Sequence, residues 1–202
     1  VQSGLGEVLV ACDSEAIASV VRAAGGRAVL TDPELPSGSD RIYAALCHSD
    51  PDKKYDVIVN LQGDMPTLDA SVIHKAKALL DDTAVDIGTL ASTIRDQSEL
   101  QDTAVVKIAL SGSRALYFSR AAIPHGATTH YHHIGIYAYR RKALEQFVKL
   151  PPSGLEQAEK LEQLRALEAG LRIDVAVVNT VPLGVDTPEG LEKARRIYEE
   201  ND

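Results

Sequence analysis

The sequence is organised around Val57-Ile58-Val59-Asn60-Leu61, a continuous apolar run that leads into the turn Gln62-Gly63-Asp64. An apolar run without alternation is typical of a strand that is buried on both faces. Helical spacing of apolar residues precedes it at residues 42–46 and follows it at residues 72–80. The pattern therefore predicts a strand enclosed between covering helices, with Asp64 at the mouth of the loop that follows.

The same alternation of strand and helix patterns extends from this segment over residues 1–100. Strand patterns at residues 8–12, 28–31, 57–61 and 85–91 alternate with helical patterns, the first of them over residues 14–24. Strands separated by helices indicate a parallel sheet with helices on both faces and ligands beyond the carboxyl ends of its strands. We therefore expect an α/β fold.

The alternation of strand and helix patterns stops after residue 100, where strand-like stretches follow one another. Three strand-like stretches, at residues 104–110, 114–119 and 133–139, predict an antiparallel or mixed layer, which could be a substrate platform, a subunit interface or an ordinary β layer. Helices are expected at residues 142–150 and 155–169, and a strand at 173–178. Thr187 and Pro188 mark the start of a last helix.

Composition excludes several classes of function. The 202 residues are 45% hydrophobic, and 21 basic against 29 acidic residues give a net charge of −8, which disfavours disorder and nucleic acid as a partner. No apolar run is long enough for a membrane span, so a cytoplasmic protein is expected. Cys12 and Cys47 lie in apolar segments and are expected to be reduced packing thiols. The only methionine is Met65, so translation is not expected to begin at Val1.

Two aspartates are placed alike. Asp64 follows the central strand at a glycine turn, and Asp186 lies in a glycine turn just before the last helix. Two carboxylates from separate loops suit Mg²⁺, a hard cation that prefers oxygen ligands, although an aspartate near a helix start is more often a helix cap than a metal ligand.

Other polar residues are candidates for anion binding. The loop at residues 36–41 combines Gly38, which allows close backbone approach, with hydroxyls at a helix start, where a plain N-cap is the alternative. Arg120 is a candidate cation. Lys107 interrupts an apolar run, and an edge position is the simpler explanation for it.

The histidines do not favour zinc. His132 and His133 would point to opposite faces of a strand, and no cysteine or glutamate lies near them at ligand spacing. No Ser-His-Asp order, Cys-His pair or complete phosphate-binding glycine loop is present either.

Several segments in order along the chain resemble one family. They are Ala11-Cys12-Asp13, Pro36-Ser37-Gly38-Ser39-Asp40-Arg41, Val59-Asn60-Leu61-Gln62-Gly63-Asp64, Ala115-Leu116-Tyr117-Phe118-Ser119-Arg120, His133-Ile134-Gly135-Ile136-Tyr137, Leu161-Glu162-Gln163-Leu164-Arg165 and Gly184-Val185-Asp186-Thr187-Pro188-Glu189. Together they are similar to 3-deoxy-manno-octulosonate cytidylyltransferase, or CMP-Kdo synthetase. The Gln-Gly-Asp turn is shared by many sugar nucleotidyltransferases, whereas the later motifs are more specific.

The resemblance implies a fold and a reaction. The fold is a Rossmann-like nucleotidyltransferase sheet with helices on both faces and a smaller mixed or antiparallel dimerisation layer. Residues 1–100 and 170–202 would be the nucleotide-binding core, and residues 101–169 an inserted sugar-acid-binding and dimerisation region. The enzyme would be a transferase that joins CTP to the sugar acid Kdo, releasing diphosphate and giving CMP-Kdo for lipopolysaccharide biosynthesis.

The resemblance also implies roles for individual residues. Asp64 and Asp186 would be catalytic as ligands of Mg²⁺. The sugar-acid pocket would contain Gln62, Arg120, His133, Tyr137, Glu162 and Gln163, with Arg120 and His133 facing the carboxylate. The nucleotide side would contain Asp13, Ser37, Gly38 and Arg41. A homodimer is expected.

The sequence departs from the family pattern at its start. The family's N-terminal strand and the loop that holds the triphosphate are not found before Val1. Met65 replaces an acidic residue, and His132 stands where an arginine is frequent. Two alternatives remain: a CTP-dependent nucleotidyltransferase for another sugar acid, or a non-catalytic fragment that only binds or dimerises.

Overall fold

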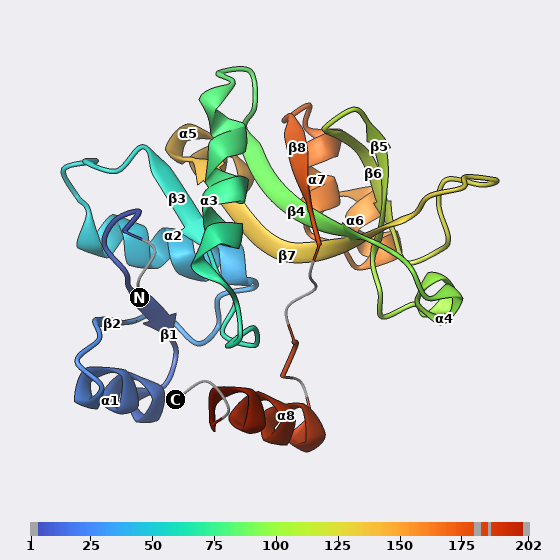
Figure 1. Cartoon of the computed structure of the whole chain (residues 1–202). Coiled ribbons are helices and arrows are strands. Elements are labelled where there is room, and N and C mark those ends of the chain that lie inside the picture. Colours follow the sequence, from blue (N-terminus) through green and yellow to red (C-terminus); the bar gives the residue numbers. More distant parts are fainter. Residues whose placement is uncertain (1–3, 180–182, 186, 200–202) are drawn as a thin grey trace.

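The computed structural model of the chain describes residues 4–179, 183–185 and 187–199. Its first part is a two-stranded parallel sheet of β1 (Val10–Cys12) and β2 (Ala28–Leu30), joined by helix α1 (Glu15–Ala23) (Figure 1). The side chain of Ser14 caps α1 by accepting from the backbone N–H of Ala16. The predicted strand–helix unit is confirmed.

The remaining strands form one six-stranded sheet in the order β3-β7-β4-β8-β6-β5. They are β3 (Val57–Asn60), β4 (Ile87–Thr93), β5 (Lys107–Ser111), β6 (Arg114–Ser119), β7 (Tyr131–Arg140) and β8 (Ile173–Val178). The strand predicted at residues 85–91 begins two residues later, and those at 114–119 and 173–178 are confirmed.

The expectation of a parallel sheet around the central strand is wrong. β4 and β8 are parallel, but β7 lies between β3 and β4 and runs antiparallel to both. Strand order depends on long-range pairing, and the periodicity of single segments does not contain it. The mixed or antiparallel layer predicted after residue 100 is confirmed, because β5 pairs antiparallel with both β6 and β7.

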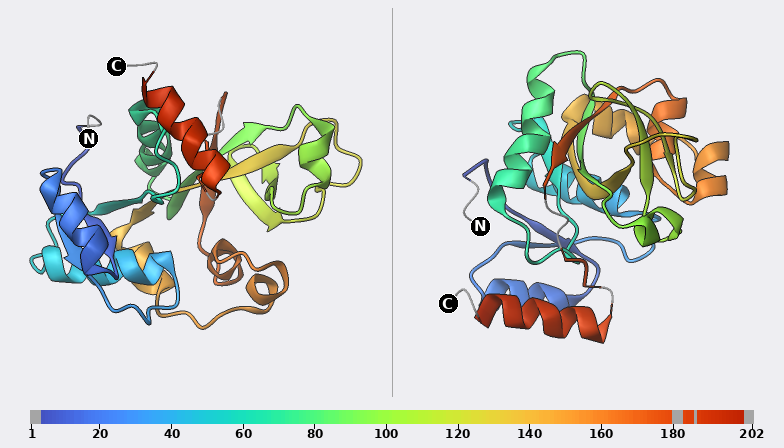
Figure 2. Two further views of the ribbon diagram at one scale, coloured as in Figure 1. Left: turned by 90° about the horizontal axis from the view of Figure 1, so that it is seen from below. Right: turned by 45° about the vertical axis from the view of Figure 1, so that its right-hand side comes forward.

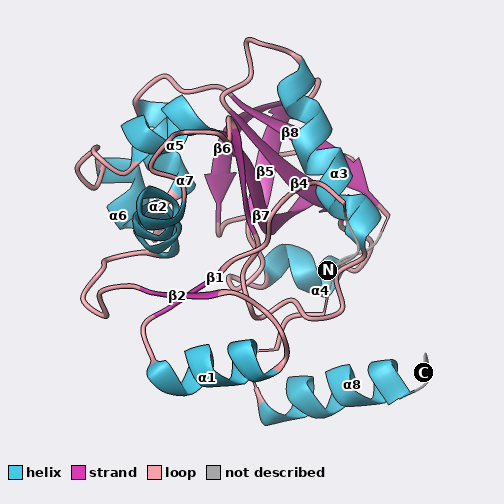
Figure 3. Ribbon diagram, turned by 90° about the vertical axis from the view of Figure 1, so that its left-hand side faces the viewer, coloured by secondary structure: helices cyan, strands magenta, loops and turns pink. Residues whose placement is uncertain are grey.

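Helices cover both faces of this sheet (Figure 3). Helix α3 (Ala70–Ala78) and the short 3₁₀ turn at Leu79–Asp81 lie on one face, and α2 (Gly38–Ser49), α5 (Arg141–Phe147) and α7 (Gln163–Glu168) lie on the other. Gly88 of β4 permits the close approach of α3, since a Cβ there would lie 2.3 Å from the carbonyl oxygen of Ala76.

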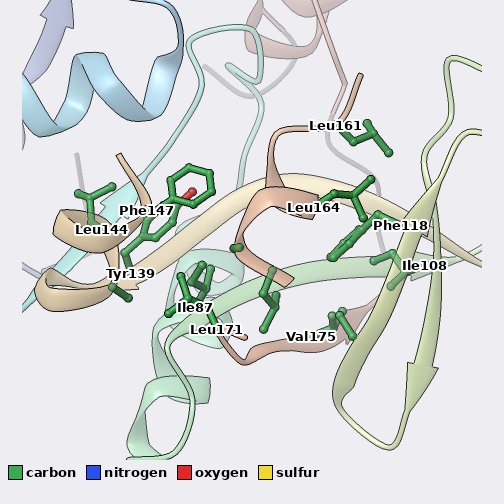
Figure 4. Packing of buried hydrophobic residues seen from close by; sticks show 14 of the residues in the cluster. Ile87, Ile108, Phe118, Tyr139, Leu144, Phe147, Leu161, Leu164, Leu171 and Val175 are labelled. Atoms are coloured by element: carbon green, nitrogen blue, oxygen red, sulfur yellow. The ribbon is translucent and has the colours of Figure 1, made fainter. Parts of the chain in front are cut away.

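Each face has its own hydrophobic core. On the α3 side, Val72 and Ala76 pack against Leu90 and Ile136 of the sheet. On the opposite side, Phe118 and Leu164 belong to the larger cluster, which Figure 4 shows between the sheet and the helices α5 and α7. Two buried faces explain why the strands are apolar almost throughout.

The single helix predicted at residues 155–169 is two helices. α6 (Gly154–Glu159) ends at Lys160, which adopts a left-handed conformation with φ 55°, and α7 begins at Gln163 with Glu162 as its N-cap. Because a left-handed residue cannot continue an α-helix, the chain changes direction there. Glu159 and Gln163, which are four positions apart, therefore do not share one helical face.

The other helices lie at the periphery. α4 (Gln97–Gln101) follows β4, and α8 (Pro188–Glu199) begins at Pro188 as predicted, with the Thr187 hydroxyl accepting from the N–H of Gly190 at 3.1 Å. Both α1 and α8 lie beyond the end of the sheet where β1 and β2 are found (Figure 2). No helix in the described ranges is long and apolar enough to span a membrane.

Two expectations about burial are wrong. On α1 the predicted apolar face is largely exposed, with Val20 70% accessible, because only Ala18 of this helix is buried. Both cysteines are free, but only Cys12 is buried; Cys47 lies exposed on α2 and is not a packing thiol. Spacing places residues on one face of a helix without fixing how closely the next layer covers it.

Candidate functional site

The N-terminus of α2 brings together the four residues expected on the nucleotide side. Ser37 caps the helix by accepting from the N–H of Asp40 at 3.2 Å. Arg41 donates to the Thr31 hydroxyl at 2.7 Å and forms an ion pair with Asp13 at 3.2 Å. Asp13 directly follows β1, so these groups lie at the carboxyl ends of two parallel strands.

Gly38 leaves this region open. A Cβ built on Gly38 would meet nothing within 4 Å among the protein atoms. The backbone at the start of α2 is therefore accessible to a ligand, and helix N-termini favour anions and polar ring edges. Nucleotide binding at this place stays a prediction.

β7 carries His133 and Tyr137, two of the residues expected in the sugar-acid pocket. Their rings lie 5.5 Å apart between centroids, and the edge of His133 meets Phe118 at 5.1 Å. Gln62 lies against the same strand, since its Nε2 atom is 3.7 Å from where a Cβ of Gly135 would be. The structure thus brings Gln62 to β7 at the glycine between His133 and Tyr137.

The Thr89 hydroxyl determines the state of His133. It lies 3.0 Å from Nε2 of His133 and donates to the carbonyl oxygen of Ile136 at 2.8 Å. A hydroxyl has one hydrogen, so Thr89 accepts from His133 and the imidazole carries its proton on Nε2. Sequence reasoning missed Thr89; a threonine inside a buried apolar strand is the signal that could have found it.

His133 is neutral in this environment. Burial lowers its pKa from 6.5 to about 3, and the neighbouring His132 acts in the same direction. With Nε2 protonated, Nδ1 is an acceptor. In the unliganded protein His133 is therefore a neutral hydrogen-bonding group, which suits a hydroxyl, and the carboxylate contact that the resemblance implies stays a prediction.

Tyr137 also remains neutral. Burial raises its pKa well above 10.0, and Tyr139 and Glu162 add to that shift. Its phenol is therefore a hydrogen-bond donor and acceptor at physiological pH.

Arg120 is held by backbone carbonyl groups. Its guanidinium donates to the carbonyl oxygens of Glu159 and Thr103, each at 2.9 Å, and of Lys160 at 3.4 Å. The carboxylate of Glu159 accepts from the backbone N–H of Arg120 at 2.9 Å. A guanidinium has five N–H donors, so two remain for a ligand in a fixed orientation.

Lys107 is not an edge residue. Although β5 is the last strand of the sheet, Lys107 also pairs with β7 opposite His132 and is fully buried. Its ammonium donates to the carbonyl oxygens of Asp102, Val105 and Arg120 at 2.6, 2.9 and 2.9 Å. Burial lowers the pKa of Lys107. It is a structural cation behind Arg120 and does not face a ligand.

Glu162 and Gln163 lie at the start of α7. Gln163 is buried, and Glu162 accepts a hydrogen bond from the hydroxyl of Ser39 at 3.1 Å through Oε2. The other carboxylate oxygen, Oε1, is buried and has no hydrogen-bond partner among the described residues. This contact joins the start of α2 to a residue expected in the sugar-acid pocket, across 123 positions of sequence.

Asp64 has the features of a metal ligand. Its Oδ1 atom is buried without a hydrogen-bond partner in the described part of the chain. Its carbonyl oxygen accepts from the N–H of Val185 at 2.8 Å, which holds the segment 183–185 beside it. Asp186, the second expected ligand, lies outside the described residues. A buried, unpaired carboxylate oxygen is a donor that suits Mg²⁺.

Comparisons with known proteins agree with this geometry. A family model described as cytidylyltransferase matches residues 1–173. The chain is 59% identical to a 3-deoxy-manno-octulosonate cytidylyltransferase of Bradyrhizobium sp. (strain ORS 278), over 97% of this chain and 82% of the relative. It is 53% identical to the enzyme of that name from Paramagnetospirillum magneticum, over 98% of this chain and 82% of the relative.

Two solved structures are similar to the chain. A structure of CMP-2-keto-3-deoxy-manno-octonic acid synthetase complexed with CTP is similar with a TM-score of 0.89 and 36% identity, over 98% of this chain and 83% of that one. A glucose-1-phosphate thymidylyltransferase structure from Bacillus anthracis shares the fold, with a TM-score of 0.60 and 14% identity over 95% of this chain and 74% of that one.

Proposed function

Since the chain belongs to the family of 3-deoxy-manno-octulosonate cytidylyltransferases, we infer that it transfers the CMP group of CTP to Kdo, giving CMP-Kdo and diphosphate. The observation that carries this is the contact between Ser39 and Glu162, because it joins the family's nucleotide residues and its sugar-acid residues into one site. The product is an activated sugar for lipopolysaccharide assembly.

The reaction replaces one bond to phosphorus with another. The anomeric hydroxyl of Kdo attacks the α-phosphorus of CTP, the bond from that phosphorus to the bridging oxygen of the β-phosphate breaks, and the hydroxyl proton is lost to solvent or a base. Little covalent chemistry falls to the protein, so its contribution is positioning and electrostatic stabilisation.

Different groups of residues bind the two substrates. The start of α2, with Ser37, Gly38 and Arg41 braced by Asp13, binds the nucleotide. The two remaining N–H donors of Arg120 bind the carboxylate of Kdo. The neutral groups His133 and Tyr137 and the amides of Gln62 and Gln163 bind its hydroxyls, as does Glu162.

A divalent metal fits the proposed site. Asp64, with its buried unpaired oxygen, and Asp186 would hold Mg²⁺, which when bound would neutralise charge on the phosphate oxygens. The protein's net charge of −8 opposes two anionic substrates, so local positive charge is needed at the site.

We also propose that two copies associate through the region of residues 101–169. Leu116 of β6 and Leu155 of α6 are exposed there, at 56% and 40% of their surface. Large apolar side chains at a surface favour a protein contact. Residues 1–100 and 170–202 would then form the nucleotide-binding core of each copy. Because it would use CTP, we propose that the protein works in the cytoplasm.

The test is a diphosphate-release assay. The purified protein, produced from its complete natural reading frame, is incubated with CTP, Mg²⁺ and Kdo, and in parallel with N-acetylneuraminate as the competing sugar acid. We expect release with Kdo, and a loss of at least about a hundredfold in Asp64→Ala because charge stabilisation is removed. Turnover with N-acetylneuraminate alone would select another sugar acid as substrate, and no release with either would reject the enzyme.

A further inference from the structure

Ser39 has a buried hydroxyl that the start of α2 does not explain. It is the second residue of the helix and is only 2% exposed. The cap of α2 is supplied by Ser37, whose side chain accepts from the N–H of Asp40. The hydroxyl of Ser39 instead leaves the helix and donates to Oε2 of Glu162 at 3.1 Å.

The hydroxyl is fixed from a second side by β7. Ser39 is in hydrogen-bond contact with the phenol of Tyr139, which is itself buried. A serine hydroxyl has one hydrogen, which Ser39 donates to Glu162, so the buried phenol of Tyr139 lies beside a hydroxyl whose orientation is already set. Three elements, α2, β7 and the start of α7, therefore meet at Ser39.

The carboxyl group of Glu162 is left with one bound and one free oxygen. Oε2 is held by Ser39, whereas Oε1 is buried with no partner in the described part of the chain. A buried acceptor without a partner costs free energy unless a ligand supplies the missing donor. The geometry thus points Oε1 to a hydroxyl of a bound molecule.

The charged state of Glu162 depends on few neighbours. Burial raises its pKa, and Asp40 of α2 adds to that shift. The hydroxyls of Ser37 and Ser39 and the guanidinium of Arg165 on α7 act in the opposite direction. On β7, Tyr137 and Tyr139 are neutral phenols. Loss of the Ser39 hydroxyl therefore removes one of the few groups that favour the carboxylate.

We propose that Ser39 is a positioning residue: it holds the Glu162 carboxylate so that Oε1 receives a hydroxyl of the sugar acid. The proposal rests on the proposed function for the identity of that ligand. It assigns a second role to the segment at residues 36–41, which shapes the sugar-acid pocket as well as the nucleotide side. Ser39 acts through Glu162 and does not itself contact the reacting atoms.

The experiment compares Ser39→Ala and Ser39→Thr with the wild-type protein in the diphosphate assay. In Ser39→Ala we expect KM for Kdo to rise about tenfold, the loss typical of one hydrogen bond to a charged group, and KM for CTP to change less than about twofold. Ser39→Thr keeps the hydroxyl and should recover most of the affinity. In a Glu162→Gln background, Ser39→Ala should add little.

The matched control is Ser113→Ala. Ser113 donates to the carboxylate of Asp174 at 2.7 Å, which is the same chemistry at the opposite end of β6 from Arg120. Its removal should leave both KM values unchanged. A fall in kcat with both KM values rising equally in Ser39→Ala would indicate a general structural defect and overturn the proposal.

A second readout does not need turnover. In the unliganded protein, a ¹³C titration of the Glu162 carboxyl should show a higher pKa in Ser39→Ala than in the wild type, and no change in Ser113→Ala. An unchanged pKa would show that Ser39 does not hold Glu162. If the wild type releases no diphosphate, the proposed function fails and the sugar-acid part of the proposal with it, while the titration still decides the contact.

Discussion

His133 shows how one hydroxyl can set the chemistry of a binding residue. The Thr89 hydroxyl accepts a hydrogen bond from the Nε2–H group and leaves Nδ1 as an acceptor, and burial keeps the ring neutral. A histidine in a polar motif suggests a cation, and no local pattern reveals that Phe118 and Tyr137 surround it. The sequence was enough to select His133 as a candidate binding residue, but its protonation state depends on the packed sheet.

The neutral ring leads to a prediction for the folded protein. The pKa of His133 is about 3 in the fold and 6.5 in the unfolded chain, so the unfolded state binds more protons between these values. Stability is therefore lost as the pH falls from 6.5 towards 3, by about 1.4 kcal/mol per unit from this group. NMR of the imidazole should show no titration of His133 between pH 5 and 8.

His133→Asn provides the comparison for this prediction. Urea unfolding at pH 7 and pH 5 should show a smaller loss of stability in the variant than in the wild type, because the titrating group is absent. If the imidazole signal of His133 in the wild-type protein shifted with a midpoint near 6.5, it would contradict the assignment of a buried neutral histidine.

At the scale of elements, much of the fold was predictable from the sequence. The strands at residues 114–119 and 173–178 and the start of the last helix at Pro188 were confirmed because each rests on a local pattern or cap. The errors concern long-range order. β7 returns between β3 and β4, and that pairing has no signature within any one segment.

The break between α6 and α7 is also an element-scale feature. Apolar residues continue at helical spacing through it, so periodicity predicts one helix. The chain turns at Lys160, and an ion pair between Arg165 of α7 and Glu156 of α6 at 2.6 Å holds the two helices together. The side chains of Arg165 and Glu156 are only 10% and 13% exposed. The guanidinium also lies 5.2 Å from the ring centroid of Phe147.

This ion pair predicts a large stability effect. Arg165→Ala would leave the largely covered Glu156 carboxylate without its cationic partner, with only the N–H of Ser153 still bound to it, and should lower the free energy of unfolding by about 3 kcal/mol. The control is Arg195→Ala, which removes an exposed Arg–Glu pair on α8 and should cost less than about 0.5 kcal/mol. Equal losses in chemical denaturation would contradict the argument.

At the scale of the whole molecule, the site is assembled from both ends of the chain. Asp13 and the start of α2 come from the first 41 residues, Glu162 from α7, and the segment 183–185 is tied to Asp64. The resemblance to a family identified these residues together. Spacing alone left most of them open to simpler readings, because the contacts that join their segments are long-range.

The proposed homodimer belongs to this scale. The wild-type protein should sediment with twice the mass of one chain, and Leu116→Lys should shift it towards the monomer because a charge would be buried in the interface. Val20→Lys on α1 is the control, since Val20 is even more exposed than Leu116 but lies outside residues 101–169. A wild-type protein that is monomeric at all concentrations would exclude the dimer.

The close approach of α3 at Gly88 has a consequence for mutational screens. Even alanine there would place its methyl group against the Ala76 carbonyl, so the helix would have to move off the sheet and open the core that Val72 and Leu90 share. A library selected for activity would therefore lose nearly every variant at position 88. By that measure the position would be indistinguishable from a substrate-binding residue, although it contributes only the absence of a side chain.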